Sequence, residues 1–207
     1  MMGEHLFTYT NPTNQRHLDQ ICQVLEEDGL LAIPAGSSWM FCCAATSRKA
    51  VARIQKLKPG RAKDKPFSLV CANISMAAQM ASIDGQAYRL LNRICPGHFT
   101  VLLKSSRMLP KLLKNKRQVV GIRIPDEEIA LAVVEHFGKP LVASSIPASA
   151  DGTLLSMGYA IFEEHGQGLD LVVDMGEELP GSPTTILDMT GHGVEVIREG
   201  AGDLSAL

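Results

Sequence analysis

The segment VVGIRIPDEEIALAVVEHFGKPLVASS, residues 119–145, decides the fold class. Its first six residues are apolar except for Arg123 and end at a proline, a pattern typical of a buried strand. Residues 126–138 begin with three acidic residues and end at a glycine, which predicts a helix with a favourable charge at its start. Residues 141–145 predict a second strand, which ends in two serines. A strand, a helix and a strand in succession favour an α/β domain.

The rest of the chain continues this mixture of strands and helices. Further helices are predicted from Asn11-Pro12 to Gly29, over 47–57 and over 84–94, and residues 58–66 are predicted to form a loop. Further strands are predicted at 30–33, 67–71, 99–104, 169–174, 184–189 and 194–199. We therefore expect a single-domain α/β fold with a twisted, open, mixed sheet of about eight strands. Because the last strands follow one another without helices, some of them should pair antiparallel.

Composition suits one globular domain, since the 207 residues are 45% hydrophobic and carry a net charge of -2. No apolar run approaches the length of a membrane span, and the N-terminus lacks the pattern of a signal peptide. The sequence has five cysteines and no C-x-x-C pair, and four of them lie in apolar surroundings that predict reduced core residues of a cytoplasmic protein. The histidines and cysteines lack metal-ligand spacing, so we expect no metal held by the protein.

The small net charge hides a strong asymmetry. Residues 1–124 hold 18 Lys/Arg and 7 Asp/Glu, whereas residues 125–207 hold 2 and 15. Fifteen of the 20 basic residues lie in the segments 48–65 and 104–123. These segments could be solvated faces or an anion site for a nucleotide or RNA, and the sequence alone leaves both open.

The standard phosphate-binding and serine-nucleophile motifs are absent from the sequence. Polar residues instead gather at the ends of predicted strands: Ser37, Ser38, Arg61, Arg123, Ser144, Ser145, Thr184, Thr185 and Arg198. Ligands of open α/β sheets bind at strand ends, and hydroxyls with guanidinium groups suit carboxylates and phosphates. The alternatives are that Arg123 faces solvent and that each hydroxyl caps nearby backbone.

The order of several short blocks resembles a known family. The blocks are AIPAGSSW, KLKPGRAKDKPFSLVC, PGHFTVLLK, VGIRIPDEE, PLVASSIPAS, GSPTTILDM and VIREGAGD. Their succession is similar to the YrdC/YciO family of threonylcarbamoyl-AMP synthase-like proteins, and most of all to its YciO-type branch. The resemblance extends over residues 6–202, which we expect to form one YrdC-like domain.

The resemblance implies an α/β sheet with a large, concave, basic face and a known reaction. L-Threonine, bicarbonate and ATP, brought with Mg²⁺, would give threonylcarbamoyl-adenylate and pyrophosphate for the threonylcarbamoyladenosine modification of tRNA. The family has also been linked to double-stranded RNA. Alternatives are therefore a non-catalytic protein that binds double-stranded RNA or tRNA on the same face, and an acid-adenylating or acyl-adenylate-hydrolysing relative with another substrate.

The family's site residues carry over unevenly, and none is assigned as catalytic. The resemblance implies that threonine or another carboxylate would be bound by Ser37, Arg123, Ser145 and Thr184. It implies nucleotide contacts for Arg61, Lys65 and Arg198, and the basic segments suggest RNA contacts for Arg53, Lys56, Lys58, Lys114, Lys116 and Arg117. Two blocks depart from the family. The K-x-R block reads Pro59-Gly60-Arg61 with Lys58 one place off, and Pro147 replaces the asparagine of S-A-N.

Overall fold

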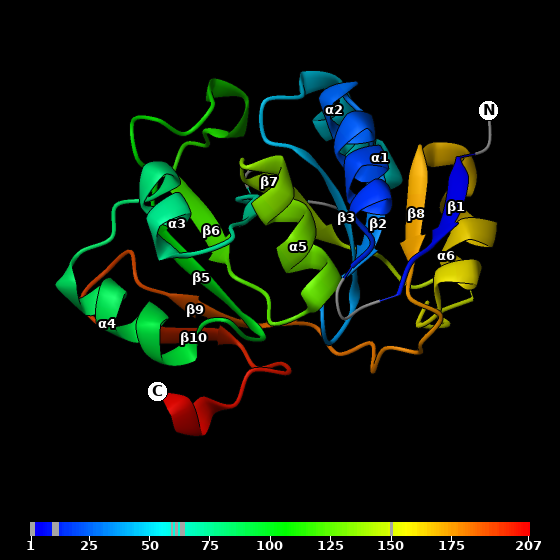
Figure 1. The fold of residues 1–207 in the computed structure, drawn as a ribbon. Helices are drawn as coiled ribbons and strands as arrows, with labels where there is room; N and C mark the ends of the chain where they lie inside the picture. Colours follow the sequence, from blue (N-terminus) through cyan, green and yellow to red (C-terminus); the bar gives the residue numbers. More distant parts are fainter. Residues whose placement is uncertain (1–2, 10–12, 59, 61, 63–64, 150) are drawn as a thin grey trace.

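The computed structural model describes residues 3–9, 13–58, 60, 62, 65–149 and 151–207. Ten strands form one mixed sheet in the order β1-β8-β2-β3-β7-β4-β6-β5-β9-β10, with helices on both faces (Figure 1). The prediction of a single-domain α/β fold with an open mixed sheet is thus confirmed. The first and last strands are the two edges, so the N- and C-terminal regions lie at opposite ends of the molecule.

The strands are β1 (Glu4–Phe7), β2 (Leu31–Pro34), β3 (Trp39–Ala44), β4 (Ser68–Val70), β5 (Phe99–Lys104), β6 (Val119–Arg123), β7 (Leu141–Ser145), β8 (Leu171–Asp174), β9 (Thr185–Asp188) and β10 (Glu195–Arg198). The helices are α1 (Gln15–Glu26), α2 (Arg48–Leu57), α3 (Ile74–Met80), α4 (Gly85–Ile94), α5 (Glu128–Phe137) and α6 (Gly158–His165). Short 3₁₀ turns occur at η1 (Lys111–Leu113), η2 (Gly166–Gly168) and η3 (Leu204–Ala206). Within the described residues, no helix is long and apolar enough to cross a membrane.

The sheet separates two apolar clusters, and the central strand β3 contributes to both. Trp39 and Phe41 join the cluster that contains α2, α3, α4 and α6, whereas Met40 and Cys42 join the cluster that contains α1 and α5. Alternate residues of a strand point to opposite faces, so α1 and α5 cover one face and the larger cluster the other. All six residues of β3 are buried because both faces are covered there.

Side chains with acceptor oxygens fix where most helices begin. Ser47, Asp84 and Glu127 each accept a hydrogen bond from a backbone N–H in the first turn of α2, α4 and α5. Helix α1 begins after Asn14, which accepts from the Arg16 N–H at 2.9 Å. The predicted start at Asn11-Pro12 lies outside the described residues.

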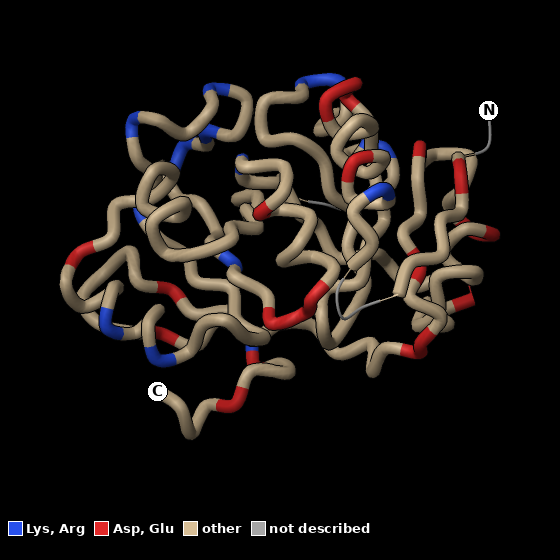
Figure 2. Tube along the Cα trace, viewed as in Figure 1, with Lys and Arg blue, Asp and Glu red and all other residues tan. Residues whose placement is uncertain are grey.

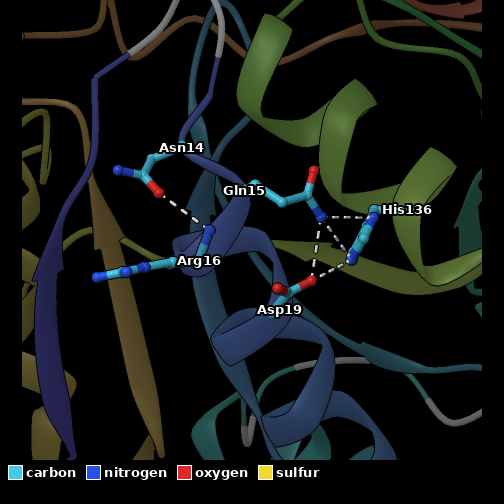
Figure 3. A network of polar contacts seen from close by, with 5 residues as sticks. All are labelled: Asn14, Gln15, Arg16, Asp19 and His136. Carbon is cyan, nitrogen blue, oxygen red and sulfur yellow. Dashed lines mark hydrogen bonds and ion pairs between the residues drawn. The ribbon is translucent and has the colours of Figure 1, made fainter.

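A polar network joins the exposed sides of α1 and α5 (Figure 3). The Asp19 carboxylate lies 2.8 Å from His136 Nε2 and accepts from the Gln15 side chain at 3.0 Å. These contacts, with the Gln15 bond first, lower the pKa of Asp19 below its usual value. The network links the two helices that cover one face of the sheet.

Four elements were absent from the sequence prediction: β1, β3, α3 and α6. Strand β3 is a continuous apolar run without the alternation of a half-exposed strand. Strand β1 has only four residues, and its parallel pairing with β8 joins segments far apart in the chain. Helix α6 begins at a glycine and has no side-chain cap. The predicted elements otherwise agree with the structure to within a few residues at their ends.

Candidate active site

A pocket of about 380 Å³ lies over the face of the sheet that also carries α1 and α5. Seven neighbouring strands contribute to it: β3, β7, β4, β6, β5, β9 and β10. The loop that follows α2 supplies part of the wall. The polar lining residues are Ser38, Lys58, Lys65, Ser68, Thr100, Arg123, Ser144, Ser145, Thr184 and Arg198.

Strand pairing brings together the lining residues of β6, β5, β9 and β10. Thr100 of β5 pairs with Ile186 of β9, and Ile186 in turn lies opposite Arg198 of β10. On the other side of β5, Val101 pairs with Ile122 of β6, the residue before Arg123. Residues more than 70 positions apart therefore share one floor because of the strand order, which no local sequence pattern reveals.

Arg123 is a buried cation at the pocket, with only 7% of its surface exposed. Its Nη2 donates to the carbonyl oxygen of Ala35, whereas its Nε has no hydrogen-bond partner among the described residues. Burial lowers the pKa of the guanidinium to about 10, an effect opposed by Asp126 and Glu127, so the group stays charged at neutral pH. The alternative of a solvent-facing Arg123 is wrong, and the unused Nε suits an anionic ligand.

Arg198 and Thr184 form a second polar group. Arg198 Nε and Nη2 donate to the Thr184 carbonyl oxygen at 3.1 and 2.6 Å, and Nη2 lies 3.3 Å from Thr184 Oγ1. Thr184 Oγ1 also lies 2.9 Å from Thr100 Oγ1. Burial lowers the pKa of Arg198 from its usual value. The two residues predicted from the sequence therefore touch, and Thr100 is a neighbour that the sequence analysis missed.

Lys58 and Ser145 meet at the end of β7. Lys58 Nζ donates to the Ser145 carbonyl oxygen at 2.7 Å and to Ser145 Oγ at 3.1 Å. Lys58 was predicted to contact RNA, but its ammonium group lies at the pocket wall. Lys65 and Pro147 also line this wall. The shifted lysine of the altered K-x-R block thus still reaches the site.

Ser37 lies beside the pocket and outside its described lining. It is 4% exposed, and its Oγ has no hydrogen-bond partner among the described residues, whereas the next residue, Ser38, lines the pocket. Gly36 has φ +84, and a Cβ there would lie 2.8 Å from His98 Cε1, so a larger residue would be strained and glycine is favoured. Arg61 lies outside the described residues, and its predicted nucleotide contact stays a prediction.

The described lining contains four basic side chains, Lys58, Lys65, Arg123 and Arg198, and no Asp or Glu. Cations held in a concave, partly buried site attract anions more strongly than they would on an open surface. Hydroxyl groups of Ser145 and Thr184 add hydrogen-bond donors. The pocket is therefore built to hold carboxylate or phosphate groups. In the described part of the chain, no group of three or more His, Cys, Asp or Glu side chains could hold a metal ion.

The residues predicted to bind RNA fall into two environments. Arg53 donates to the Asp170 carboxylate and to the Gly168 carbonyl oxygen, so it already ties α2 to the start of β8. The segment between β5 and β6 instead carries several exposed basic side chains (Figure 2). These are Arg107, Lys111, Lys114, Lys116 and Arg117, and the exposed Lys104 ends β5 just before them. One of them, Arg117, also lies 3.5 Å from Asp188.

Comparisons with known proteins agree with this geometry. The profile of a family described as "Telomere recombination" (Sua5_yciO_yrdC) matches residues 23–200. The chain is 30% identical to the uncharacterized protein YciO of Escherichia coli (strain K12), over 96% of this chain and 97% of that protein. The crystal structure of E. coli YciO superposes with a TM-score of 0.91, covering 99% of both chains at 26% identity.

Proteins with a named activity are also similar to this chain. The threonylcarbamoyl-AMP synthase of Pyrococcus abyssi is 28% identical over 85% of this chain and 52% of its own length. The crystal structure of P. abyssi Sua5 complexed with L-threonine has a TM-score of 0.84 over 95% of this chain and 57% of that protein. At 24% identity this second similarity shows a shared fold, and this chain spans only about half of the synthase.

Proposed function

The chain belongs to the Sua5/YciO/YrdC family, and on this premise we propose that its pocket joins a carboxylated amino acid to AMP. The family membership inferred from the sequence is confirmed by the profile match and by the similarity to YciO. The proposed reaction converts L-threonine, bicarbonate and ATP into threonylcarbamoyl-adenylate and pyrophosphate. The observation that supports it best is the cluster of basic and hydroxyl side chains around Arg123.

The reaction has two bond-forming steps. The threonine nitrogen first bonds to the carbon of bicarbonate, with loss of water, to give a carbamate. A carbamate oxygen then attacks the α-phosphorus of ATP, and the bond from that phosphorus to the bridging oxygen breaks. Pyrophosphate leaves with the electron pair of that bond. Catalysis of such a step needs alignment of the two reactants and stabilisation of negative charge rather than a protein nucleophile.

Each described site residue has a part in this proposal. Arg123 is the clamp for the amino-acid carboxylate, because its Nε is buried and still needs an acceptor. Ser145 and Thr184 donate hydroxyl hydrogen bonds to the same substrate, and Ser37 adds a third hydroxyl beside the pocket. The triphosphate would be held by basic groups at the pocket wall and floor: Lys58, Lys65 and Arg198. Mg²⁺ would enter with ATP rather than through a site made of protein ligands.

The test is pyrophosphate release by the full chain. We expect release that requires ATP, L-threonine and bicarbonate together, and that falls in Arg198→Ala, because that variant removes a charge at the pocket floor. Arg89→Ala is the matched control, since Arg89 is an exposed arginine of α4 outside the pocket lining. Release that persists unchanged in Arg198→Ala, or that ignores bicarbonate, contradicts the proposal.

A second candidate function is binding of double-stranded RNA or tRNA. It is favoured by the five exposed basic side chains between β5 and β6, at positions drawn blue in Figure 2, and by the exposed Lys104 at the end of β5. Such a cluster neutralises phosphates without reading sequence. This function could accompany adenylate formation or replace it. Filter retention of duplex RNA and of a tRNA transcript, measured over a range of salt concentrations, tests it separately from pyrophosphate release.

A further inference from the structure

A second pocket, of about 520 Å³, lies between α3 and α4 and is called here the α3–α4 pocket. It shares no described lining residue with the pocket around Arg123. Its lining residues are Asn73, Ile74, Ser75, Ala78, Ile83 and Tyr88. This described lining is mainly apolar and holds no charged side chain, so the pocket suits an uncharged group that is itself largely apolar.

The ring of Tyr88 is the aromatic surface of this pocket. It is 53% exposed, because the core-facing side of α4 is formed by other residues of the helix. An exposed tyrosine is ordinary on a protein surface, but one that borders a pocket can stack against a planar ligand. Asn73 Oδ1 accepts from the Met76 N–H at 2.9 Å, so the two N–H groups of this exposed amide are its remaining hydrogen-bonding groups. A planar heterocycle with acceptors on its edge, such as a nucleobase, matches this surface.

The α3–α4 pocket adjoins the start of the basic segment that follows β5. Residues 79–82 lie in the chain between two lining residues of the pocket, and they bond to that segment. The Ser82 N–H donates to the Lys104 carbonyl oxygen at 2.8 Å, and the Ser106 N–H donates to the Met80 carbonyl oxygen at 2.9 Å. The segment between β5 and β6 therefore begins beside the end of α3 (Figure 1).

The pocket and the basic segment together suit different parts of one nucleotide chain. Lys104, Arg107 and Lys114 are exposed, and Lys114 Nζ lies 3.5 Å from the Arg107 carbonyl oxygen, so these cations are available to phosphates. Asp84 caps α4 next to Ile83 in the chain and would repel a phosphate there, but it would not repel a neutral base. Phosphates are thus favoured on the segment and a base in the pocket.

From this arrangement we infer that the α3–α4 pocket holds one unpaired nucleobase of an RNA whose phosphates contact the basic segment. The inference rests on the second candidate function, RNA binding, and it narrows the ligand to RNA with an unpaired nucleotide. Bases inside an uninterrupted duplex are stacked on both faces, whereas an unpaired base can leave the stack and meet an aromatic side chain. Stacking accepts any base, so we expect little sequence preference at this position.

Filter retention of two matched RNAs tests the inference. One is an uninterrupted duplex, and the other is the same duplex with a single unpaired uridine. We expect the full chain to bind the second about tenfold more tightly, as one stacked base provides. Tyr88→Leu should lose this preference and keep its affinity for the uninterrupted duplex, because it removes the ring and no charge. Tyr88→Phe keeps the ring and is the matched control; at a half-exposed position the fold should tolerate both variants.

Photo-crosslinking locates the unpaired base directly. With 5-bromouridine at the unpaired position, we expect the crosslinked peptide of the parent chain to contain Tyr88. Equal affinity for the two RNAs, a preference that persists in Tyr88→Leu, or a crosslink confined to residues 104–117 would overturn the inference while RNA binding stands. Retention of neither RNA would overturn RNA binding and the inference together. Pyrophosphate release should be the same in Tyr88→Leu as in the parent chain, because Tyr88 lies outside the described lining of the other pocket.

Discussion

Replacement of Arg123 by lysine should weaken the binding of a small acid while the chain still folds. Lysine keeps the positive charge but presents a compact ammonium in place of the planar fork, so it cannot both donate to Ala35 and meet a carboxylate in two places. Loss of one charge-assisted hydrogen bond costs about 1.5–3 kcal/mol, which corresponds to roughly a ten- to hundredfold rise in the dissociation constant of the bound acid.

The effect on stability depends on whether the lysine still reaches Ala35. If the new ammonium group still donates to the Ala35 carbonyl, the free energy of unfolding changes little. If it does not, a buried acceptor without a partner costs about 1–3 kcal/mol. For a chain of this size each kcal/mol lowers Tm by about 2–4 °C. The fold should therefore survive in Arg123→Lys.

The assay is calorimetric titration of a small acid, with thermal unfolding of the same samples. Arg117→Lys serves as the matched control, because Arg117 is an exposed arginine outside the described pocket lining. The reasoning is refuted if Arg123→Lys binds the acid as well as the parent chain does, while Arg117→Lys is also unchanged. A large fall in Tm with unchanged binding would instead show that Arg123 is structural.

Three further predictions concern other parts of the chain. Pro147→Asn restores a side-chain amide at the pocket wall and should raise ATP affinity or pyrophosphate release; no gain would indicate a site rebuilt for another ligand. Joint replacement of Lys114, Lys116 and Arg117 by alanine should reduce the salt slope of RNA binding by about two to three units, and an unchanged slope would exclude this cluster as the RNA contact. Burial lowers the pKa of His165 below 6.5, so the neutral form is favoured in the fold. Its contribution to stability should be complete above that pH and be lost as pH falls through the lowered pKa, and urea titrations of His165→Gln should show a weaker pH dependence.

The sequence predicted those elements whose pattern is local. Helix α5 carries its own acidic start and terminal glycine, and Gly138 adopts the left-handed conformation that ends such helices. Strand β3 was missed because burial on both faces removes the alternation that marks a strand. Its run WMFCCA was the available signal, since aromatic and apolar residues without a polar partner are typical of a central strand.

The sequence indicated which residues line the pocket, but not which of them contact one another in the fold. Arg123, Ser145 and Thr184 all line the pocket, as expected from polar residues at strand ends. The bond between Lys58 and Ser145 could not be foreseen, because it joins the end of α2 to the end of β7, and the two residues are 87 positions apart. Thr100 was overlooked because threonine is common in strands for structural reasons, so its presence there does not indicate a binding site. Which strands neighbour each other is set by long-range pairing, and that pairing builds the pocket floor.

The most direct test of the proposed function is the mass of the product made with ¹³C-bicarbonate. The full chain is incubated with ATP, Mg²⁺, L-threonine and labelled bicarbonate, and the mixture is examined by mass spectrometry for threonylcarbamoyl-adenylate. The account predicts an adenylate whose mass carries the ¹³C label, formed by the parent chain and by Arg89→Ala but much less by Arg198→Ala. No labelled adenylate from the parent chain, or an equal yield from Arg198→Ala, would contradict it.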